Sequence, residues 1–124
     1  MSRKHNVRPA RPSDLDQLAP LRAALWPESA VAEHAQELAT ILAGKPFGIL
    51  PLVTFVAEGQ DGTLIGFVES GLRSSADGCD PAHPVGYVEG WYVDDSHRRQ
   101  GVGAALLRAA EDWARAQGCR EMAS

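Results

Sequence analysis

The sequence predicts a mixed α/β fold in a single domain, and three patterns carry that prediction. Residues 52–58 and 64–70 are two runs rich in β-branched and aromatic side chains, joined by a short glycine-containing turn, which is typical of a β-hairpin. Residues 101–117 place apolar side chains at helical spacing, and Gly118 follows them. The length of 124 residues suits one domain with one hydrophobic core.

The N-terminal part of the chain is expected to hold a short strand and then a helix. Residues 7–10 form the expected strand. Ser13 has the side chain of an N-cap, and leucines recur from there at helical spacing as far as Leu25. Pro20 lies inside this run, so we expect a kink or two short helices.

The remaining elements follow in an order that favours a sheet with helices on it. A second helix is expected from about Ser29, and it ends before the glycine and proline of residues 44–46. Residues 74–84 read as a polar loop and residues 87–93 as a strand. Residues 119–124 begin another strand, which we expect to be parallel to the one before the last helix. The apolar face of the second helix is expected to consist of Val31, Ala35, Leu38, Ile41 and Leu42.

The charge is unevenly distributed along the chain. The net charge of −4 argues mildly against a nucleic-acid-binding protein. Residues 1–11 hold four basic side chains and no acid, residues 12–97 hold three basic against thirteen acidic ones, and residues 98–124 hold five basic against three acidic ones. An acidic middle beside a basic C-terminal segment suits a protein that meets a cation and an anion together. A solvated acidic face with no such role is the alternative.

Cysteine, histidine and hydropathy patterns exclude several further classes. Cys79 and Cys119 lack metal or redox-motif spacing and read as free thiols of a reducing compartment. The histidines have no ligand spacing, so no metal is expected. The chain shows neither a secretory signal nor an apolar run long enough to span a bilayer, and we expect a cytoplasmic protein that does not bind membranes.

The sharpest local motif is Ser-His-Arg-Arg-Gln-Gly-Val-Gly at residues 96–103, between an expected strand and an expected helix. A helix N-terminus offers unpaired backbone amides and partial positive charge, which together bind anions. Glycines let a phosphate approach those amides, and Arg98 and Arg99 add full positive charges. The motif lacks the Lys-Ser/Thr of a P-loop and the third glycine of a dinucleotide fingerprint.

The pattern Arg98-x-x-Gly101-x-Gly103 resembles the pyrophosphate-binding motif of the GCN5-related N-acetyltransferase (GNAT) superfamily. The resemblance implies the acyl-CoA N-acyltransferase fold and acetyl-CoA as co-substrate. It also implies that the end of the preceding strand holds the acetyl and pantetheine end of that molecule. The implied cofactor-binding residues are Trp91, Tyr92, Val93, Arg98, Arg99, Gln100, Gly101, Val102, Gly103 and Ala104.

Three further segments, residues 24–27, 84–93 and 118–124, resemble the bacterial aminoglycoside 6′-N-acetyltransferases. That resemblance implies acetyl transfer to the 6′-amino group of an aminoglycoside antibiotic. It places Trp26 in the substrate pocket and Glu89 against a substrate ammonium, where a carboxylate can also take the proton of the attacking amine. A homodimer is expected on the same ground. The alternatives are an acetyltransferase for a protein N-terminus, a lysine or a polyamine, and a non-catalytic CoA-binding module.

Other candidate site residues have a structural alternative. Asp77 and Asp80 complete an acidic substrate wall or lie in a solvated loop. Glu89 is expected on an inward face of its strand, where a carboxylate needs a partner. Trp91 and Trp113 are expected to pack rather than to contact ligands.

The resemblance also sets the expected extent of the domain. Residues 1–124 are expected to form one GNAT domain, incomplete at its C-terminus, because family members continue with a further helix and two strands. We expect the group that protonates the leaving thiolate beyond residue 124.

Overall fold

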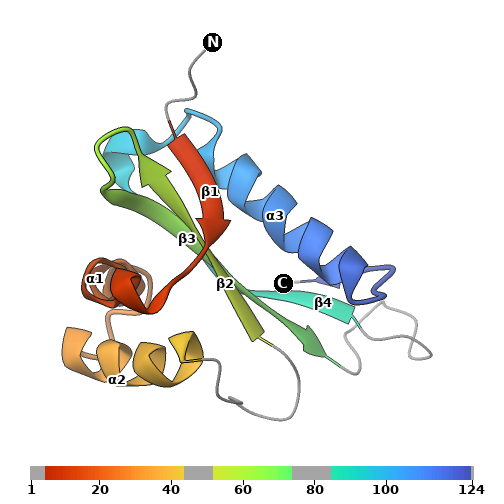
Figure 1. The fold of residues 1–124 in the computed structure, drawn as a ribbon, viewed down its shortest axis with the longest axis horizontal. Helices are drawn as coiled ribbons and strands as arrows, with labels where there is room; N and C mark the ends of the chain where they lie inside the picture. Colours follow the sequence, from red (N-terminus) through yellow and green to blue (C-terminus); the bar gives the residue numbers. More distant parts are fainter. Residues whose placement is uncertain (1–4, 44–51, 74–84, 124) are drawn as a thin grey trace.

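The chain folds into a five-stranded sheet with helices on both of its faces (Figure 1). This computed structural model describes residues 5–43, 52–73 and 85–123. Two short 3₁₀ turns, Pro12–Asp14 and Asp95–His97, accompany the main elements. In chain order these are β1 (His5–Pro9), α1 (Leu15–Leu25), α2 (Val31–Leu42), β2 (Leu52–Gly59), β3 (Leu64–Arg73), β4 (Val85–Val93), α3 (Val102–Ala116) and β5 (Met122–Ala123).

The strands lie in the sheet in the same order as in the chain. The first four pair antiparallel, and β5 pairs parallel with β4 through Gly86–Met122 and Tyr87–Ala123. The predicted hairpin and the predicted parallel strand after the last helix are confirmed. Figure 1 shows α1 and α2 on one face of the sheet and α3 on the other.

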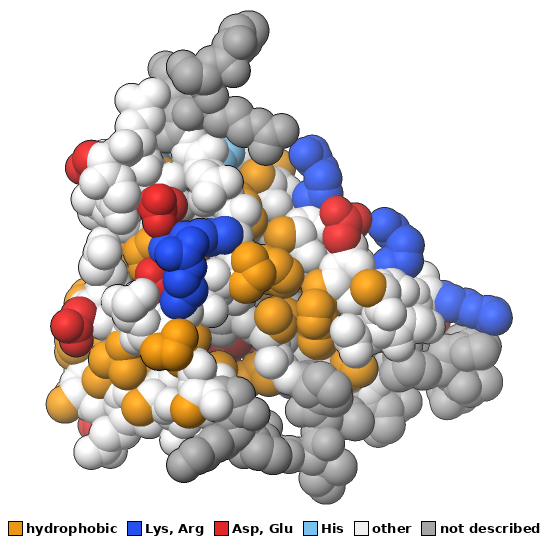
Figure 2. All heavy atoms as spheres, in the orientation of Figure 1, with side chains coloured by type: hydrophobic (Ala, Val, Ile, Leu, Met, Phe, Trp, Pro, Cys, Tyr) orange, Lys and Arg blue, Asp and Glu red, His pale blue; other side chains and the backbone are white. Residues whose placement is uncertain are grey.

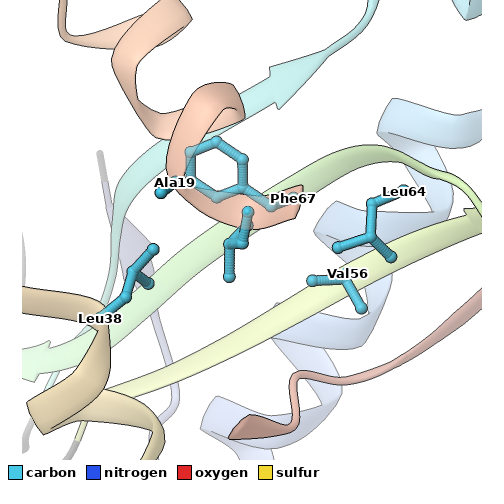
Figure 3. Close-up of a cluster of buried hydrophobic side chains, with 6 residues drawn as sticks. Ala19, Leu38, Val56, Leu64 and Phe67 are labelled. Atoms are coloured by element: carbon cyan, nitrogen blue, oxygen red, sulfur yellow. The ribbon is translucent and has the colours of Figure 1, made fainter. Parts of the chain in front are cut away.

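Two apolar clusters hold these layers together. Under α1 and α2, fully buried side chains of the helices meet Val56 and Phe67 of the sheet (Figure 3). Under α3, Leu106 and Ala110 pack on Ala57 and Val68. Adjacent residues of β2, Val56 and Ala57, therefore face opposite layers, as the pleat of a strand requires.

A β-bulge explains why the alternation in β3 is interrupted. Ala57 pairs with Gly66 but Glu58 pairs with Leu64, so Ile65 is an extra residue on β3. Leu64 consequently lies in the same cluster as Phe67, although an uninterrupted strand would point residues three apart to opposite faces.

Helix α1 differs from its prediction at two points. It is one helix across Pro20, because Pro20 is on the exposed side, where water can satisfy the carbonyl that lost its intrahelical bond. Ser13 does not cap it. Asp14, just before the helix, instead accepts a 2.7 Å hydrogen bond from the Arg11 amide and two from Arg8, at 2.8 and 2.9 Å.

Most of the predicted apolar face of helix α2 is confirmed, because Leu38 is buried and Ala35 and Leu42 pack against its cluster. Val31 departs from the prediction, since it is 48% exposed, and His34, which was not predicted, is buried. The His34 ring stacks on Trp26, and its Nε2 lies 3.0 Å from the Trp26 carbonyl oxygen, which ties α2 to the end of α1. A polar side chain thus occupies a core position because it has a backbone partner there.

No helix among the described residues is both long and apolar enough to cross a membrane.

Candidate functional site

The segment between β4 and α3 forms a cradle of backbone amides at the start of a helix. Gly101 is the N-cap of α3 with φ +80°, and no side chain caps the helix. Arg99 also adopts a positive φ, 66°, which is uncommon for a residue with a side chain. The first amides of α3 are therefore available to an anion, as predicted from the motif.

A pocket of about 310 Å³ opens beside this cradle. It brings together the C-terminal end of β4 and the start of α3, and one residue from α1, Leu25, completes it. The predicted acetyl-CoA residues that line the pocket are Trp91, Tyr92, Val93, Arg98, Arg99 and Gly103.

Gly103 is the point of closest approach between helix and strand. A Cβ at this position would lie 3.0 Å from Cζ2 of Trp91. Trp91 packs on α3, as expected, but it is also 46% exposed and its ring lines the pocket. The absent side chain of Gly103 therefore lets the indole and the helix start share one wall.

Arg98 is fixed at the mouth of this pocket by contacts of its own. Its Nε donates to the Val93 carbonyl at 3.1 Å, and its Nη1 lies 2.6 Å from Asp95 Oδ1. Its guanidinium is 5.9 Å from the centre of the Tyr92 ring. These contacts orient Arg98, and its side chain is still about half exposed.

The other predicted cofactor residues differ in their exposure. Gln100 and Ala104 are exposed at the helix start. Val102 is buried in the cluster under α3, so only its backbone amide can face an anion.

Glu89 differs from its prediction. In β4, Gly90 pairs with Glu69 and Val88 with Ser70, so Glu89 is the extra residue of a second bulge. The bulge turns Glu89 out of the regular pleat. Its side chain is one-third exposed and bonds the guanidinium of Arg73, so the expected inward orientation is wrong, although it has a partner.

Trp26 lies over the neighbouring residue of the same bulge. A Cβ on Gly90 would overlap the Trp26 ring, at 2.5 Å from Cζ2, and would come within 3.1 Å of Leu25 Cδ2. Leu25 also lines the pocket, so it connects the pocket with the region around Trp26 and Gly90. The predicted substrate residue Trp26 thus lies over Gly90 of β4, and predicted co-substrate residues follow on the same strand.

The comparisons with known proteins agree with this geometry. The family model described as Acetyltransferase (GNAT) family matches residues 15–124. The chain belongs to this acetyltransferase family.

Individual relatives and solved structures specify the kind of acetyltransferase that the chain resembles. An aminoglycoside N(6′)-acetyltransferase type 1 of Klebsiella aerogenes is 43% identical over 118 residues, covering 95% of this chain and 76% of the relative. The solved structure of AAC(6′)-Iy with CoA has a TM-score of 0.86 at 33% identity and covers 100% of this chain and 78% of that one. AAC(6′)-Iy with the bisubstrate analogue CoA-S-monomethyl-acetylneamine has a TM-score of 0.83 at 32% identity, covering 97% and 78%.

Sequence reasoning missed one charged cluster of this acetyltransferase. Arg22 of α1 and Glu69 of β3 are both buried, and Arg22 also reaches Glu37 at 2.8 Å. Burial raises the pKa of Glu69 above its ordinary 4.5, against the opposing effect of Arg22. A signal did exist, because Arg22 shares a helix face with Leu18 and Leu25, and Glu69 follows an apolar run.

Two predicted substrate residues, Asp77 and Asp80, lie outside the described residues. Within the part of the acetyltransferase that the structure describes, no group of three or more His, Cys, Asp and Glu side chains could hold a metal ion. Cys119 is a free, buried thiol, and burial raises its pKa, which does not suit a nucleophile.

Proposed function

We propose that this chain transfers the acetyl group of acetyl-CoA to the 6′-amino group of an aminoglycoside, and so confers resistance to such antibiotics. The observation that carries the proposal is the pocket between the end of β4 and the uncapped start of α3. The relatives of this chain support the proposed substrate class, since they are named aminoglycoside N(6′)-acetyltransferases.

Acetyl-CoA fits the cradle by charge and by shape. The pyrophosphate lies against the amides of residues 101–104, with Arg98, Arg99 and Gln100 beside it. The backbone of Trp91, Tyr92 and Val93 runs along the thioester end. Backbone N–H groups at this strand end stabilise the oxyanion that forms during transfer.

The amine lies on the other side of Leu25, near the bulge of β4. Trp26 forms one wall, and Glu89 binds an ammonium of the substrate. Asp77 and Asp80 are proposed to extend this acidic wall. The polycationic acceptor and the anionic co-substrate then lie on neighbouring stretches of one strand.

The transfer is direct and needs no covalent enzyme intermediate. The acceptor ammonium first loses a proton to Glu89, directly or through water. The free amine attacks the thioester carbonyl, a C–N bond forms, and the C–S bond breaks. As the amide forms, the attacking nitrogen gives up one further proton, and the CoA thiolate takes up that proton. No cysteine of the described chain is placed to act as a nucleophile.

We also propose that the protein is a homodimer in the cytoplasm, where acetyl-CoA is available. Size-exclusion chromatography with light scattering distinguishes a dimer from a monomer.

The test is release of the CoA thiol from acetyl-CoA with three acceptors: neamine, a basic peptide and spermidine. Release with neamine alone supports the proposal. Release with the peptide or spermidine alone supports the alternative amine acetyltransferase, and acetyl-CoA binding without release supports a binding module. Mass spectrometry of the product identifies the acetylated amine, and acetylation elsewhere than at the 6′ position contradicts the regiochemistry.

A further inference from the structure

The carboxylate of Glu89 is already bound to a cation of the same chain. Arg73, at the end of β3, places Nη2 3.1 Å from Oε1 and 3.0 Å from Oε2 of Glu89, and its Nε lies 3.2 Å from Oε1. Both carboxylate oxygens thus accept hydrogen bonds from one guanidinium. This is the position that a substrate ammonium needs if Glu89 is to bind it.

Arg73 is held at this position from a second side. Its Cζ lies 3.5 Å from the centre of the Tyr87 ring, so the guanidinium is stacked on an aromatic face. Tyr87 and Glu89 are two residues apart on β4, and Arg73 pairs with Val85 at the end of the same ladder. Stacking and ion pairing therefore orient the guanidinium together.

The pair is also open to competition. The Arg73 side chain is 46% exposed and that of Glu89 32%, so solvent and a ligand can reach both. Exposed ion pairs contribute little to stability, which means that a cation with several contacts can replace one partner. Two other carboxylates, Glu69 of β3 and Glu37 of α2, are engaged elsewhere, because both bond Arg22.

We infer that Arg73 is an internal counter-ion of Glu89 that a substrate ammonium must displace, so that Arg73 weakens the binding of the amine substrate. The inference rests on the proposed function. A displaced Arg73 keeps its Tyr87 contact, so it need not leave the site.

The cost of this displacement does not depend on the number of charges on the acceptor, because every acceptor must break the same Arg73–Glu89 contact. Arg73 therefore weakens the binding of all amines that use Glu89 by a similar factor.

The experiment is isothermal titration of neamine into wild-type protein and Arg73→Gln, each saturated with CoA. Glutamine keeps much of the side-chain length but removes the charge. We expect neamine to bind about two- to fivefold more tightly to Arg73→Gln, the range that an exposed ion pair allows. Arg73→Lys keeps the charge without the planar fork, so its dissociation constant lies between the two.

A matched control separates the specific contact from net charge. Arg115→Gln also removes one arginine from an exposed ion pair, that with Asp112 on α3, at 3.1 Å. Figure 2 shows Arg side chains along the outer edge of α3, away from the sheet. We expect Arg115→Gln to bind neamine as the wild type does. Equal tightening in both variants would overturn the inference.

A double-mutant cycle supplies the second test. In the Glu89→Gln variant, the carboxylate that binds both Arg73 and the substrate ammonium is already absent. We therefore expect that adding Arg73→Gln does not make neamine bind more tightly. Tightening of the same size in both backgrounds means that Arg73 only repels cations from a distance, and it overturns the inference.

The outcomes also separate this inference from the proposed function. If the wild type binds and acetylates neamine but Arg73→Gln does not bind it more tightly, the inference fails and the function stands. If the wild type neither binds nor acetylates neamine, the proposed function fails and the inference fails with it. Thermal melts of each variant confirm that it is folded.

Discussion

Arg22 and Glu69 form a two-point ion pair inside the protein, with Nε 3.0 Å from Oε2 and Nη2 3.1 Å from Oε1. Their side chains are each only 6% exposed. The guanidinium also lies 5.1 Å from the centre of the Trp26 ring, and Glu69 pairs across the sheet with Gly90, over which that ring lies. The pair therefore joins α1 to the sheet beside the proposed substrate site.

Breaking one half of this pair is expected to cost much more than replacing both halves. Glu69→Ala leaves the Arg22 charge buried with only the exposed Glu37, and we expect a loss of about 3–5 kcal/mol in the free energy of unfolding. Arg22→Met combined with Glu69→Leu replaces the pair by apolar side chains. We expect the free energy of unfolding of this double variant to be within about 1 kcal/mol of the wild-type value, or higher. Urea titration measures both, and a double variant as unstable as Glu69→Ala contradicts this account.

Glu89→Gln tests the role of the bulge carboxylate. We expect a 10²- to 10⁴-fold lower turnover on an amine acceptor, on the order of what a general base contributes, because glutamine cannot take a proton. Acetyl-CoA binding is measured in parallel by calorimetry and is expected to change little. Equal losses of turnover and of acetyl-CoA binding would show that Glu89 supports the fold of β4 rather than the reaction.

Substitutions at two glycines with nearly the same positive φ separate the effect of backbone strain from that of ligand binding. Gly101 has φ +80° and Gly62 has φ +84°, and a Cβ on either would meet nothing within 4 Å. Alanine at each position is therefore expected to cost a similar ~1 kcal/mol of stability, measured by urea unfolding. Only Gly101→Ala is expected to raise the KM for acetyl-CoA, by roughly tenfold, because it changes the start of α3. A similar rise in Gly62→Ala would point to general destabilisation.

Two glycines of β4 make a second matched pair. A Cβ on Gly90 would overlap the Trp26 ring, whereas one on Gly86 would overlap Met122 Sδ and lie 2.7 Å from Ala114 Cβ. Both alanine variants are expected to lose about 1–3 kcal/mol of stability through overpacking. We expect Gly90→Ala alone to raise the KM for the amine, because it displaces Trp26. Steady-state kinetics with neamine would contradict this if the two variants behaved alike.

Asp14 is expected to control the acid limit of stability. The hydrogen bonds from Arg8, together with that from the Arg11 amide, hold its pKa below the ordinary 3.8. A depressed carboxyl pKa contributes stability above the unfolded value, and that stability is lost as pH falls below about 3.8 through the folded value. Asp14→Asn therefore lowers stability at pH 7 by about 1–2 kcal/mol and flattens the acid limb.

The control for that pH series is Asp112→Asn, which removes only an exposed ion pair with Arg115. It is expected to change the free energy of unfolding at pH 7 by less than about 0.5 kcal/mol. Unfolding by urea at pH 3, 4, 5 and 7 compares the two variants. Wild-type and Asp14→Asn curves with the same slope below pH 4 would contradict the assignment to Asp14.

Local signals predicted the hairpin, α3 and the cradle of backbone amides at the start of α3, because each depends on residues close in sequence. Periodicity marks α3, turn residues mark the hairpin, and the glycines mark the helix start. Within the site, the cradle and the part of the pocket formed by the end of β4 belong to one such segment, residues 91–104.

Other features depend on pairing between distant segments, and the sequence pattern does not contain it. The bulge at Glu89 is a property of the β3–β4 register, so the direction of that side chain was predicted wrongly. Arg22 and Glu69 are 47 residues apart and meet only when α1 packs on the sheet. Pro20 is tolerated because of which side of α1 faces water, and this also depends on the packed helix.

Because the indole of Trp91 is exposed and lines the pocket, its fluorescence can report whether the pocket is occupied. The chain has three tryptophans, and Trp26 and Trp113 are both more shielded than Trp91. A collisional quencher such as iodide therefore reaches the emission of Trp91 first, and a molecule seated on α3 shields it. Occupancy by CoA becomes readable from native fluorescence, without a label and without turnover.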